Sequence, residues 1–582
     1  MVRIFRIINI LTVLAPLSGI SQTAEQVFKA AGTPANPNVN VSWNRYYTYD
    51  GLVEIMEKLE DAYPELVTLE SIGQTYQGKD IMAMTITDRS TGDPESKPGF
   101  YIDGNIHSNE IQGSEVALYT AWYLVESFAE NEFVNQLLEK KTFYILPSIN
   151  PDARDNYMQE GNTMHSPRSG MIPVDDDRDG LEDEDGYDDL NNDGHITLMR
   201  RKNPNGRYKK SPEDPRWMVR VKPDEDGSYE LLGYEGIDND GDGNINEDRV
   251  GGVYDPNRDW GFSWQPNYIQ RGAYKYPFSL PVTRAVKEFL ERHPNIAGAQ
   301  TYHNSGGMIL RGPGAGKDTD TYSGSDKAVY DAIGKIGEQM LPGYKYMVLY
   351  KDLYTTFGGE IDWLHGGRGI YTFSNELFTP YHFFNDQNDQ KGYFGGADTH
   401  YSFDELLLFK DAFVDWQPYD HPQYGQIEIG GFKKNFIRPH PGFLLETDAH
   451  RNMAFSLYHA NQTPELVVDS VMEKKLGNGL YEITVVVANK KIIPTHSDHD
   501  IKNKIERPDY ISLSGPKVLA GMKVTNLDLN LTEDQEYQPE KIEVPNIPGK
   551  GTVTVRWIVK GNPGDYQILI DSAKGGKLQW TK

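Results

Sequence analysis

The stretch GFYIDGNIH (residues 99–107), followed by EVALYTAWYLVESFA (115–129) and KTFYILPSINPD (141–152), decides the fold class of this chain. The first and third segments are apolar runs with aromatic and branched side chains, which predicts two buried strands. The middle segment has its apolar residues at the spacing of an amphipathic helix. Two buried strands joined by a helix favour a parallel pair within one sheet.

The alternation of strands and helices continues on both sides of this stretch. Strands that alternate with helices over about 400 residues predict an α/β fold with a mixed, largely parallel central sheet flanked by helices. We expect further helices within residues 49–67, 282–293 and 328–341, and further strands at 68–74, 80–88, 295–303 and 367–377.

Two regions break this alternation. Residues 155 to about 250 are polar, rich in Gly and Asp and without a sustained apolar period, so we interpret them as a long insertion rather than as core elements. After about Pro464, short β-branched runs are separated by Gly, Pro and Asn. This pattern predicts a small C-terminal β-sandwich.

The length of 582 residues exceeds that of one ordinary core, so we expect two or three domains. We predict a signal peptide at 1–22, an α/β domain at 42–460 that contains the insertion, and the β-sandwich at 465–582.

The first 22 residues contain two Arg, an apolar stretch and then small residues, as in a cleaved secretory signal. A short membrane anchor is the alternative, but Pro16 and Gly19 interrupt the apolar stretch, and we see no other segment suited to spanning a bilayer. We therefore predict a secreted or periplasmic protein, and the absence of cysteine favours a bacterial source.

Composition limits the partners and the metal chemistry. Asp and Glu number 85 against 58 Lys and Arg, a formal net charge of -27, so we expect no nucleic acid partner. Without cysteine, a metal ion would have to be bound by His and carboxylate side chains.

A candidate metal site begins directly after the first quoted strand. His107 and Glu110 are three residues apart, and an imidazole and a carboxylate at this spacing can bind one metal ion. Taken alone, the pair fits an exposed polar helix start better than a metal site. His303 ends a later predicted strand, and as a third ligand it would leave the fourth position of a catalytic zinc ion open for water. A hydrogen-bonded core histidine is the alternative for His303 alone.

Glu376 lies near the end of the predicted strand 367–377. Catalytic groups of open α/β sheets collect at such strand ends. A carboxylate beside a zinc-bound water can accept its proton and pass it to the leaving amine. A salt-bridge partner is the alternative role for this residue.

The order of these motifs resembles the zinc carboxypeptidases of the carboxypeptidase A type, over roughly residues 42 to 460 without the insertion. The implied activity is zinc-dependent removal of C-terminal residues from peptides. The motifs that support the resemblance are HSNE (107–110), RRKN (200–203), DPNRDW (255–260), TYHNSGG (301–307), LYTTFGGEIDW (353–363) and YTFSNEL (371–377).

The resemblance implies a role for individual residues. His107, Glu110 and His303 would bind zinc, and Glu376 would activate water. Arg201 would polarise the scissile carbonyl and stabilise the oxyanion. Asn257 and Arg258 would hold the free α-carboxylate of the substrate, and Tyr354 would close over it and donate from its hydroxyl. Ile361 would favour an apolar or aromatic C-terminal side chain, although a one-residue shift of the alignment would bring Glu360 or Asp362 to that position.

The insertion contains a second candidate metal site. Asp238, Asp240 and Asp242 alternate before Gly243, a spacing at which a tight loop places oxygen ligands around calcium. Similar runs occur at 175–180 and 189–194, but none has a Glu at loop position twelve. A solvated acidic loop is the alternative for each single run, and for the whole region we predict structural calcium.

Two other functions stay open at this stage. One is the cleavage of cell-wall peptides, or of another amidated acid, with the same metal. The other is a calcium-dependent binding or adhesion protein that retains a peptidase fold. The complete set of metal and catalytic positions favours an enzyme over this second alternative.

Overall fold

The computed structural model describes residues 31, 32, 34, 36–163, 167–385 and 397–582. The predicted signal peptide, residues 1–22, lies outside the described residues. Within the described ranges, no helix combines the length and the apolar character needed to cross a bilayer.

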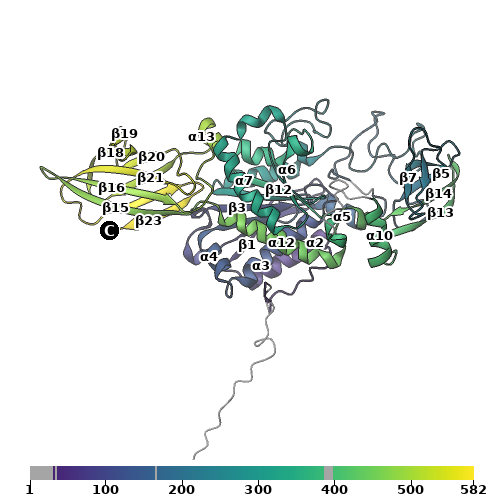
Figure 1. Cartoon of the computed structure of the whole chain (residues 1–582), viewed down its shortest axis with the longest axis horizontal. Coiled ribbons are helices and arrows are strands. Elements are labelled where there is room, and N and C mark those ends of the chain that lie inside the picture. Colours follow the sequence, from purple (N-terminus) through teal and green to yellow (C-terminus); the bar gives the residue numbers. More distant parts are fainter. Residues whose placement is uncertain (1–30, 33, 35, 164–166, 386–396) are drawn as a thin grey trace, which may run out of the picture.

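An eight-stranded sheet forms the centre of the molecule (Figure 1). Its four middle strands are parallel, whereas β1 and β2 run antiparallel at one side and β10 runs antiparallel to β12 at the other. The predicted mixed, largely parallel sheet is therefore confirmed. In sheet order the strands are β1 (Val67–Gln74), β2 (Asp80–Ile86), β4 (Thr142–Leu146), β3 (Gly99–Gly104), β9 (Ile296–Asn304), β12 (Tyr371–Leu377), β10 (Met308–Arg311) and β11 (Lys345–Val348).

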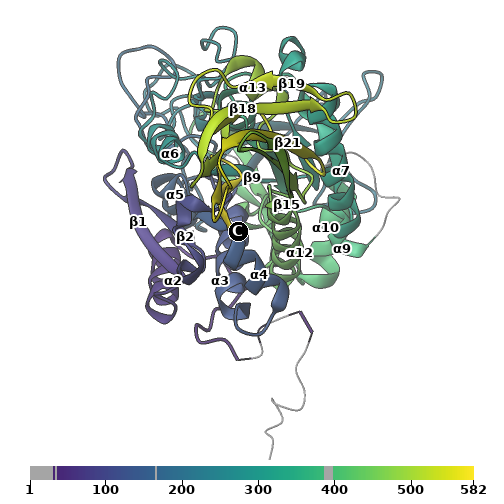
Figure 2. The same ribbon diagram turned by 90° about the vertical axis from the view of Figure 1, so that its left-hand side faces the viewer.

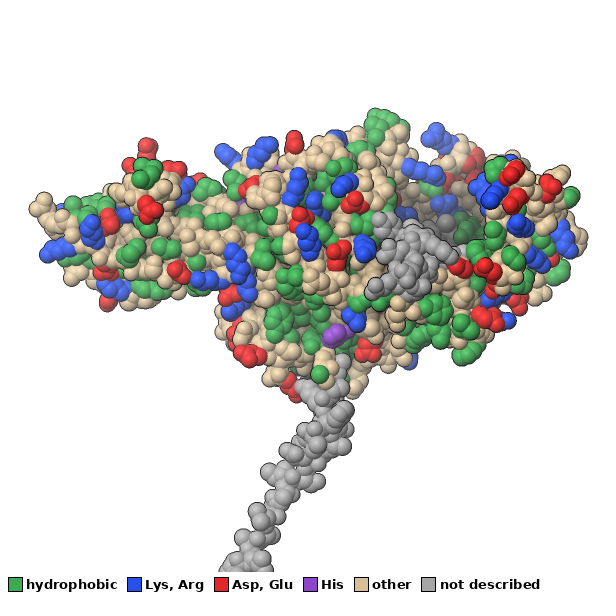
Figure 3. Space-filling view, viewed as in Figure 1, with side chains coloured by type: hydrophobic (Ala, Val, Ile, Leu, Met, Phe, Trp, Pro, Cys, Tyr) green, Lys and Arg blue, Asp and Glu red, His purple; other side chains and the backbone are tan. Residues whose placement is uncertain are grey.

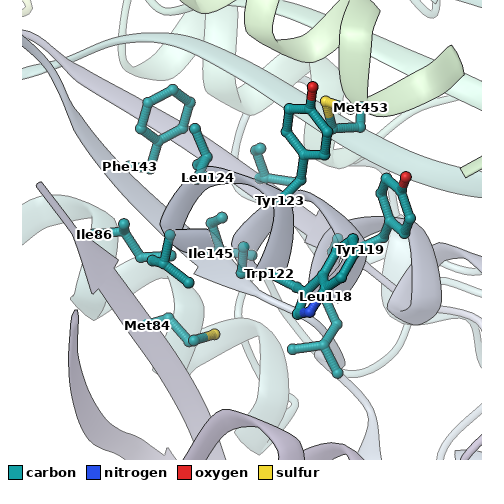
Figure 4. Close-up of a cluster of buried hydrophobic side chains, with 14 of the residues drawn as sticks. Met84, Ile86, Leu118, Tyr119, Trp122, Tyr123, Leu124, Phe143, Ile145 and Met453 are labelled. Carbon is teal, nitrogen blue, oxygen red and sulfur yellow. The ribbon is translucent and has the colours of Figure 1, made fainter. Parts of the chain in front are cut away.

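Helices cover both faces of this sheet. One face shares a hydrophobic core with α2 (Tyr49–Ala62), α3 (Gln112–Ser127), α4 (Glu132–Lys140) and α12 (Gly442–Asn461). Figure 4 shows part of this core, with Leu118 and Trp122 of α3 beside Met84, Ile86 and Ile145 of the sheet. The opposite face packs against α6 (Pro281–Arg292). The predicted helices thus form where the apolar spacing indicates.

Further helices lie around the central sheet and the helices that cover it. α7 (Gly324–Met340) packs with α12 in a separate core cluster. The shorter elements are α5 (Pro151–Gln159), α8 (Glu360–Asp362), α9 (Tyr381–Phe384), α10 (Ala397–Leu407) and α11 (Lys434–Ile437).

The insertion contributes strands to a second sheet, which the sequence analysis did not predict. This sheet has six antiparallel strands, and two of them come from the distant segment 413–432. It lies at the opposite end of the molecule from the C-terminal sheets (Figure 1). In sheet order its strands are β13 (Phe413–His421), β14 (Gly425–Phe432), β5 (Leu198–Lys202), β8 (Tyr229–Tyr234), β6 (Tyr208–Lys210) and β7 (Met218–Arg220).

The C-terminal region consists of two antiparallel sheets, as predicted, and Figure 2 shows them in front of the α/β body. Their inner faces share a core that includes Trp557, Ile511 and Ile570. One sheet contains β15 (Leu466–Gly477), β16 (Leu480–Asn489), β21 (Thr552–Lys560), β18 (Lys517–Asn526) and β19 (Leu531–Asp534), and the other contains β20 (Lys541–Val544), β17 (Asp509–Ser514), β22 (Gln567–Ser572) and β23 (Gly576–Thr581).

Buried polar contacts join the C-terminal sheets to the α/β body. The Lys574 ammonium donates to the backbone carbonyls of Arg368 (2.8 Å) and Gly369 (2.9 Å), just before β12. It also pairs with Asp500 of α13 (Asp498–Asn503) at 3.1 Å, and both side chains are almost fully buried. His499 of the same helix contacts the carbonyl of Gly366 at 3.0 Å.

The surface carries charges of both signs. Figure 3 shows acidic and basic side chains interspersed over one face of the molecule, so that face has no continuous basic patch.

Candidate metal and active site

Three predicted ligands meet at the carboxyl edge of the central sheet. His107 and Glu110 follow β3, and His303 lies near the end of β9, which is parallel to β3. Because neighbouring parallel strands end at the same edge, residues far apart in the sequence come together there. The Glu110 Oε2 atom lies 2.9 Å from Nδ1 of His107 and 2.8 Å from Nδ1 of His303.

The donor set fits a zinc ion. The three ligand atoms lie within 4.8 Å of one another, and all three residues are buried. Two imidazoles and one carboxylate form a common ligand set of catalytic zinc. Burial alone would raise the pKa of Glu110, but the two imidazoles outweigh this effect and hold its pKa well below the usual range. The carboxylate is therefore ready to bind a cation.

Asp255 orients the first ligand, a role that the sequence analysis did not assign. His107 Nε2 lies 2.9 Å from Asp255 Oδ1. Burial would raise the pKa of Asp255, but the Arg168 guanidinium and the His107 imidazole hold it well below its usual range. A carboxylate on the second ring nitrogen fixes the tautomer and orientation of a metal-binding imidazole. The sequence signal was the position of Asp255, two residues before Asn257 in DPNRDW.

Glu376 lies beside the three ligands. It is paired with His303 in the register of β12 and β9, and both side chains line the same cleft. Burial, with a further contribution from Glu110, raises the pKa of Glu376 to about 7. A carboxyl group with such a pKa can accept and release a proton near neutral pH.

Arg201 is not brought to this cleft, which corrects its assignment as the oxyanion residue. It lies on β5 of the six-stranded sheet and pairs with Glu230 at 2.9 Å. Two other arginines, Arg168 and Arg258, line the cleft, and the guanidinium in contact with the predicted zinc ligands belongs to Arg168, in a segment that contains no motif. Arg168 Nη2 lies 2.8 Å from His107 Nε2, Nη1 lies 3.3 Å from Glu110, and Nε donates to Asp255 at 3.0 Å.

The predicted carboxylate-binding residues lie at the same cleft. Asn257 Nδ2 is 3.5 Å from His303 Nε2, and its Oδ1 accepts from the backbone N–H of Glu360 at 2.8 Å. Arg258 donates to the carbonyl of Asn257 at 2.6 Å. Tyr354 also lines the cleft, and its side chain is 48% exposed, so its hydroxyl can approach a bound ligand.

Apolar side chains also line the cleft. Ile361, Leu310 and Leu349 line it and belong to one hydrophobic cluster. The two neighbouring acids lie elsewhere. Glu360 is buried near Asp103, and burial and that neighbour raise its pKa. Asp362 accepts from the backbone N–H of Gly314 at 2.9 and 3.0 Å.

Sequence comparison gives two family matches. A family model described as zinc carboxypeptidase matches residues 52–171 and 182–391. A second model, described only as a domain of unknown function, matches residues 465–581.

Curated relatives match short parts of the chain. An inactive metallocarboxypeptidase of Ajellomyces capsulatus is 29% identical over 128 residues, which are 22% of this chain and 21% of that protein. Carboxypeptidase B of Astacus astacus is 33% identical over 113 residues, which are 19% of this chain and 35% of that protein. The chain thus spans about a fifth of the first relative and about a third of the second.

Solved structures also match. Thrombin activatable fibrinolysis inhibitor aligns with a TM-score of 0.41 and 15% identity, over 74% of this chain and 78% of that chain. A carboxypeptidase A from Helicoverpa armigera aligns with a TM-score of 0.41 and 14% identity, over 74% of this chain and 76% of that chain.

Proposed function

Since the chain belongs to the zinc carboxypeptidase family, we propose that it hydrolyses the C-terminal peptide bond of peptides and proteins. One observation supports this function above all others. The cleft that contains His107, His303 and Glu376 also contains Asn257 and Arg258, so metal-ligating and carboxylate-binding groups face the same space.

The metal would be bound by His107, Glu110 and His303. Zinc at this position would polarise the scissile carbonyl and lower the pKa of a water molecule. Asp255 would hold the His107 ring in place through their 2.9 Å contact.

Glu376 would act as the general base. It is partly buried beside the ligands, and its pKa of about 7 suits a group that takes a proton from water and returns it to the leaving amine. Arg168, in place of Arg201, would stabilise the negative charge that develops on the carbonyl oxygen. Its guanidinium is fixed by Asp255 and Glu110, so little reorganisation is needed during the reaction.

Asn257 and Arg258 would bind the free α-carboxylate of the substrate. A guanidinium can donate two parallel hydrogen bonds to a carboxylate, which gives both affinity and orientation. The exposed Tyr354 hydroxyl would donate to the bound C-terminus. These contacts would restrict cleavage to the last peptide bond of a chain.

The side-chain preference would be apolar or aromatic. Ile361, Leu310 and Leu349 offer apolar contacts, and neither Glu360 nor Asp362 lines the cleft. A basic C-terminal side chain would lose its hydration there without gaining a carboxylate partner.

Two alternative functions can be distinguished from this one by experiment. Cleavage of cell-wall peptides or another amidated acid would use the same metal with a different substrate. A calcium-dependent binding or adhesion protein would retain the fold without turnover, and one relative of this chain is itself named as inactive. We further propose that the predicted N-terminal signal directs export to the periplasm or the medium.

The test is a substitution of the proposed base. Glu376→Gln should lower kcat by about 10²–10⁴-fold on peptides ending in Leu or Phe, while the zinc content stays at that of the wild type. Glu288→Gln, an exposed substitution on α6, is the matched control and should leave both values unchanged. Undiminished hydrolysis by Glu376→Gln would refute the mechanism.

The same assay separates the alternatives. C-terminally amidated peptides should resist cleavage if Asn257 and Arg258 bind the free carboxylate. Equal cleavage of free and amidated peptides would contradict this role, and zinc binding without any hydrolysis would favour the adhesion alternative.

A further inference from the structure

Two loops of the insertion, residues 175–184 and 240–248, bring many carboxylates together. They form three groups whose ligand oxygens lie within 4.8 Å of one another, and Asp177 belongs to all three. The groups cross from one loop to the other, so the sequence spacing within one loop does not create them. Their members are Asp175, Asp177, Asp179, Glu184, Asp240, Asp242, Glu247 and Asp248.

The protein itself supplies little positive charge to these carboxylates. Among the described residues, none of the eight forms an ion pair with a Lys, Arg or His side chain. Carboxylates at such short separations repel one another unless protons or a cation intervene. The arrangement therefore lacks a positive partner.

Asp248 adds an independent observation. Its side chain is fully buried (0% exposed), and its oxygens belong to the group with Asp175 and Asp177. Oδ2 accepts from the backbone N–H of Asp176 at 3.3 Å, but Oδ1 has no hydrogen-bond partner in the described part of the chain. A buried carboxylate oxygen without a partner is costly, and such oxygens in native proteins often mark a bound ion.

Two further acids behave in the same way. Both carboxylate oxygens of Glu184 and of Glu247 are inaccessible and have no hydrogen-bond partner within the described ranges. Glu184 belongs to the group with Asp177, Asp179 and Asp240, and Glu247 to the group with Asp177, Asp240 and Asp242. Each of the three groups therefore contains an oxygen without a partner.

Two other acids of these runs lie outside the three groups, although they make the same kind of hydrogen bond within their own loop as Asp175 does with the backbone N–H groups of Arg178 and Gly180. Asp189 accepts from the backbone N–H groups of Asp193 (3.0 Å) and Gly194 (2.7 Å), and Asp238 accepts from those of Gly241 (2.6 Å) and Gly243 (3.1 Å). Neither residue belongs to any of the three groups. Asp238, predicted from spacing as a ligand, thus lies outside the groups, whereas Asp240 and Asp242, which also accept from backbone N–H groups of their own loop, lie close to Asp177 of the other loop.

We propose that a calcium ion binds between the two loops, with Asp177 and the buried Asp248 among its ligands. The donors are all carboxylate oxygens, which favours a hard cation over zinc. Calcium accepts six to eight oxygens in flexible geometry, whereas magnesium requires a compact octahedron and retains several waters. A dense set of loop carboxylates therefore suits calcium.

The ion would also connect two segments of the active site. The first loop follows the segment of Arg168, and the second precedes Asp255. Contacts between these segments already exist, from Ser169 Oγ to the carbonyl of Gly252 (3.2 Å) and from Ile172 N to Tyr254 Oη (3.0 Å). A calcium ion would also join these two segments, at the acidic loops, and would thereby help to position Arg168 against Asp255.

The test measures calcium binding by the full chain. The protein is freed of divalent ions on a chelating resin, reloaded with one equivalent of zinc, and dialysed against radioactive calcium alone. We expect at least one calcium ion per chain with a Kd of about 1 mM or lower. Asp177→Asn and Asp248→Asn should each weaken binding by about tenfold or more. Asp189→Asn, in a loop of the same pattern, is the matched control and should bind as the wild type does.

A stability measurement separates ligation from a folding defect. Without calcium, Asp177→Asn should raise the thermal midpoint of the insertion because it removes repulsion, whereas with calcium it should lower it. Failure to bind calcium at about 10 mM would overturn the proposal. Equal losses in Asp189→Asn and Asp177→Asn, or equal affinity for magnesium, would also overturn it.

Discussion

The molecule contains two clusters of metal-ligating side chains, and they are built in opposite ways. His107, Glu110 and His303 stand at the ends of neighbouring parallel strands and are buried. The carboxylates around Asp177 stand on two loops whose turns are held by their own side-chain hydrogen bonds. The sheet fixes the first cluster before any metal arrives, whereas the second holds like charges together without a positive partner.

Because of this difference, we expect the two clusters to respond differently to the loss of their metal ions. In the first, two imidazoles flank the Glu110 carboxylate and hold its pKa well below the usual range, so the folded arrangement favours the carboxylate anion. In the second, the folded arrangement works against electrostatic repulsion. We expect metal removal to abolish chemistry at the first cluster but to loosen structure at the second.

Substitution of Arg168 should have the largest effect. This residue precedes the first acidic loop in the sequence, but its side chain contacts the strand-end cluster. Arg168→Ala should lower kcat/KM by about 10²–10³-fold through loss of transition-state stabilisation. Arg201→Ala should change it by less than about twofold, because a half-exposed pair with Glu230 is worth little. Steady-state kinetics on one peptide checks both. A large loss in Arg201→Ala with none in Arg168→Ala would restore the assignment made from RRKN.

Asp255 tests how firmly the zinc-binding side chains are held in place. Asp255→Asn should weaken zinc binding by about 10–100-fold, because the His107 ring loses the carboxylate that orients it. Competition with a chromogenic zinc chelator measures this. Asp259→Asn is the control, because this buried acid instead binds Ser279, Thr283 and Leu280 at the start of α6. Equal zinc loss in both variants would contradict the orienting role.

Glu235 tests the electrostatics of the insertion at a position outside the proposed calcium site. It is fully buried, its Oε1 accepts from Thr197 N and Oγ1 at 2.7 Å, and Oε2 has no partner among the described residues. Burial, with Asp193 and Asp189 adding to it against the Thr197 bonds, raises the pKa of Glu235 to about 7.

The raised pKa fixes the sign of the pH effect. The proton is bound more tightly in the folded state, so its stabilisation is complete below pH 4.5 and is lost as the pH rises through about 7. Glu235→Gln should remove this loss. Between pH 5 and pH 8, the free energy of unfolding around β5 and β8 should therefore fall by about 1–3 kcal/mol less in the variant than in the wild type. Amide hydrogen exchange in these strands measures it. An unchanged pH dependence in Glu235→Gln would show that another group is responsible.

The residues of the strand-end cluster could be predicted because each of them lies at the end of a recognisable apolar strand or just after it. His107 and Glu110 directly follow an apolar strand, and His303 ends another, so the sheet topology alone brings them together. Asp255 stood within a quoted motif, but its role depends on a contact with His107 that lies 148 positions away. The spacing of residues along the sequence cannot reveal a contact between two residues so far apart.

Arg201 was misplaced for a physical reason. β5 pairs with β14 in a register that sets Arg200 opposite Glu428, and these two residues lie 228 positions apart. β5 has only five residues and both strands are partly polar, so neither periodicity nor composition indicates the six-stranded sheet that removes Arg201 from the cleft. Arg168 has no motif around it, and only the folded chain brings it to His107. The acidic runs were likewise visible, but the contacts of Asp177 across two loops were not.

The contact of Lys574 with the backbone of Arg368 and Gly369 has a mechanical consequence. These two carbonyls lie shortly before β12, which begins at Tyr371 and positions Glu376 in the cleft. A pulling force on the C-terminal sheets would therefore act on the start of that strand through a buried ammonium group, and not only through the connection between α12 and β15. The C-terminal sheets and the cleft would then bear tension as a single body.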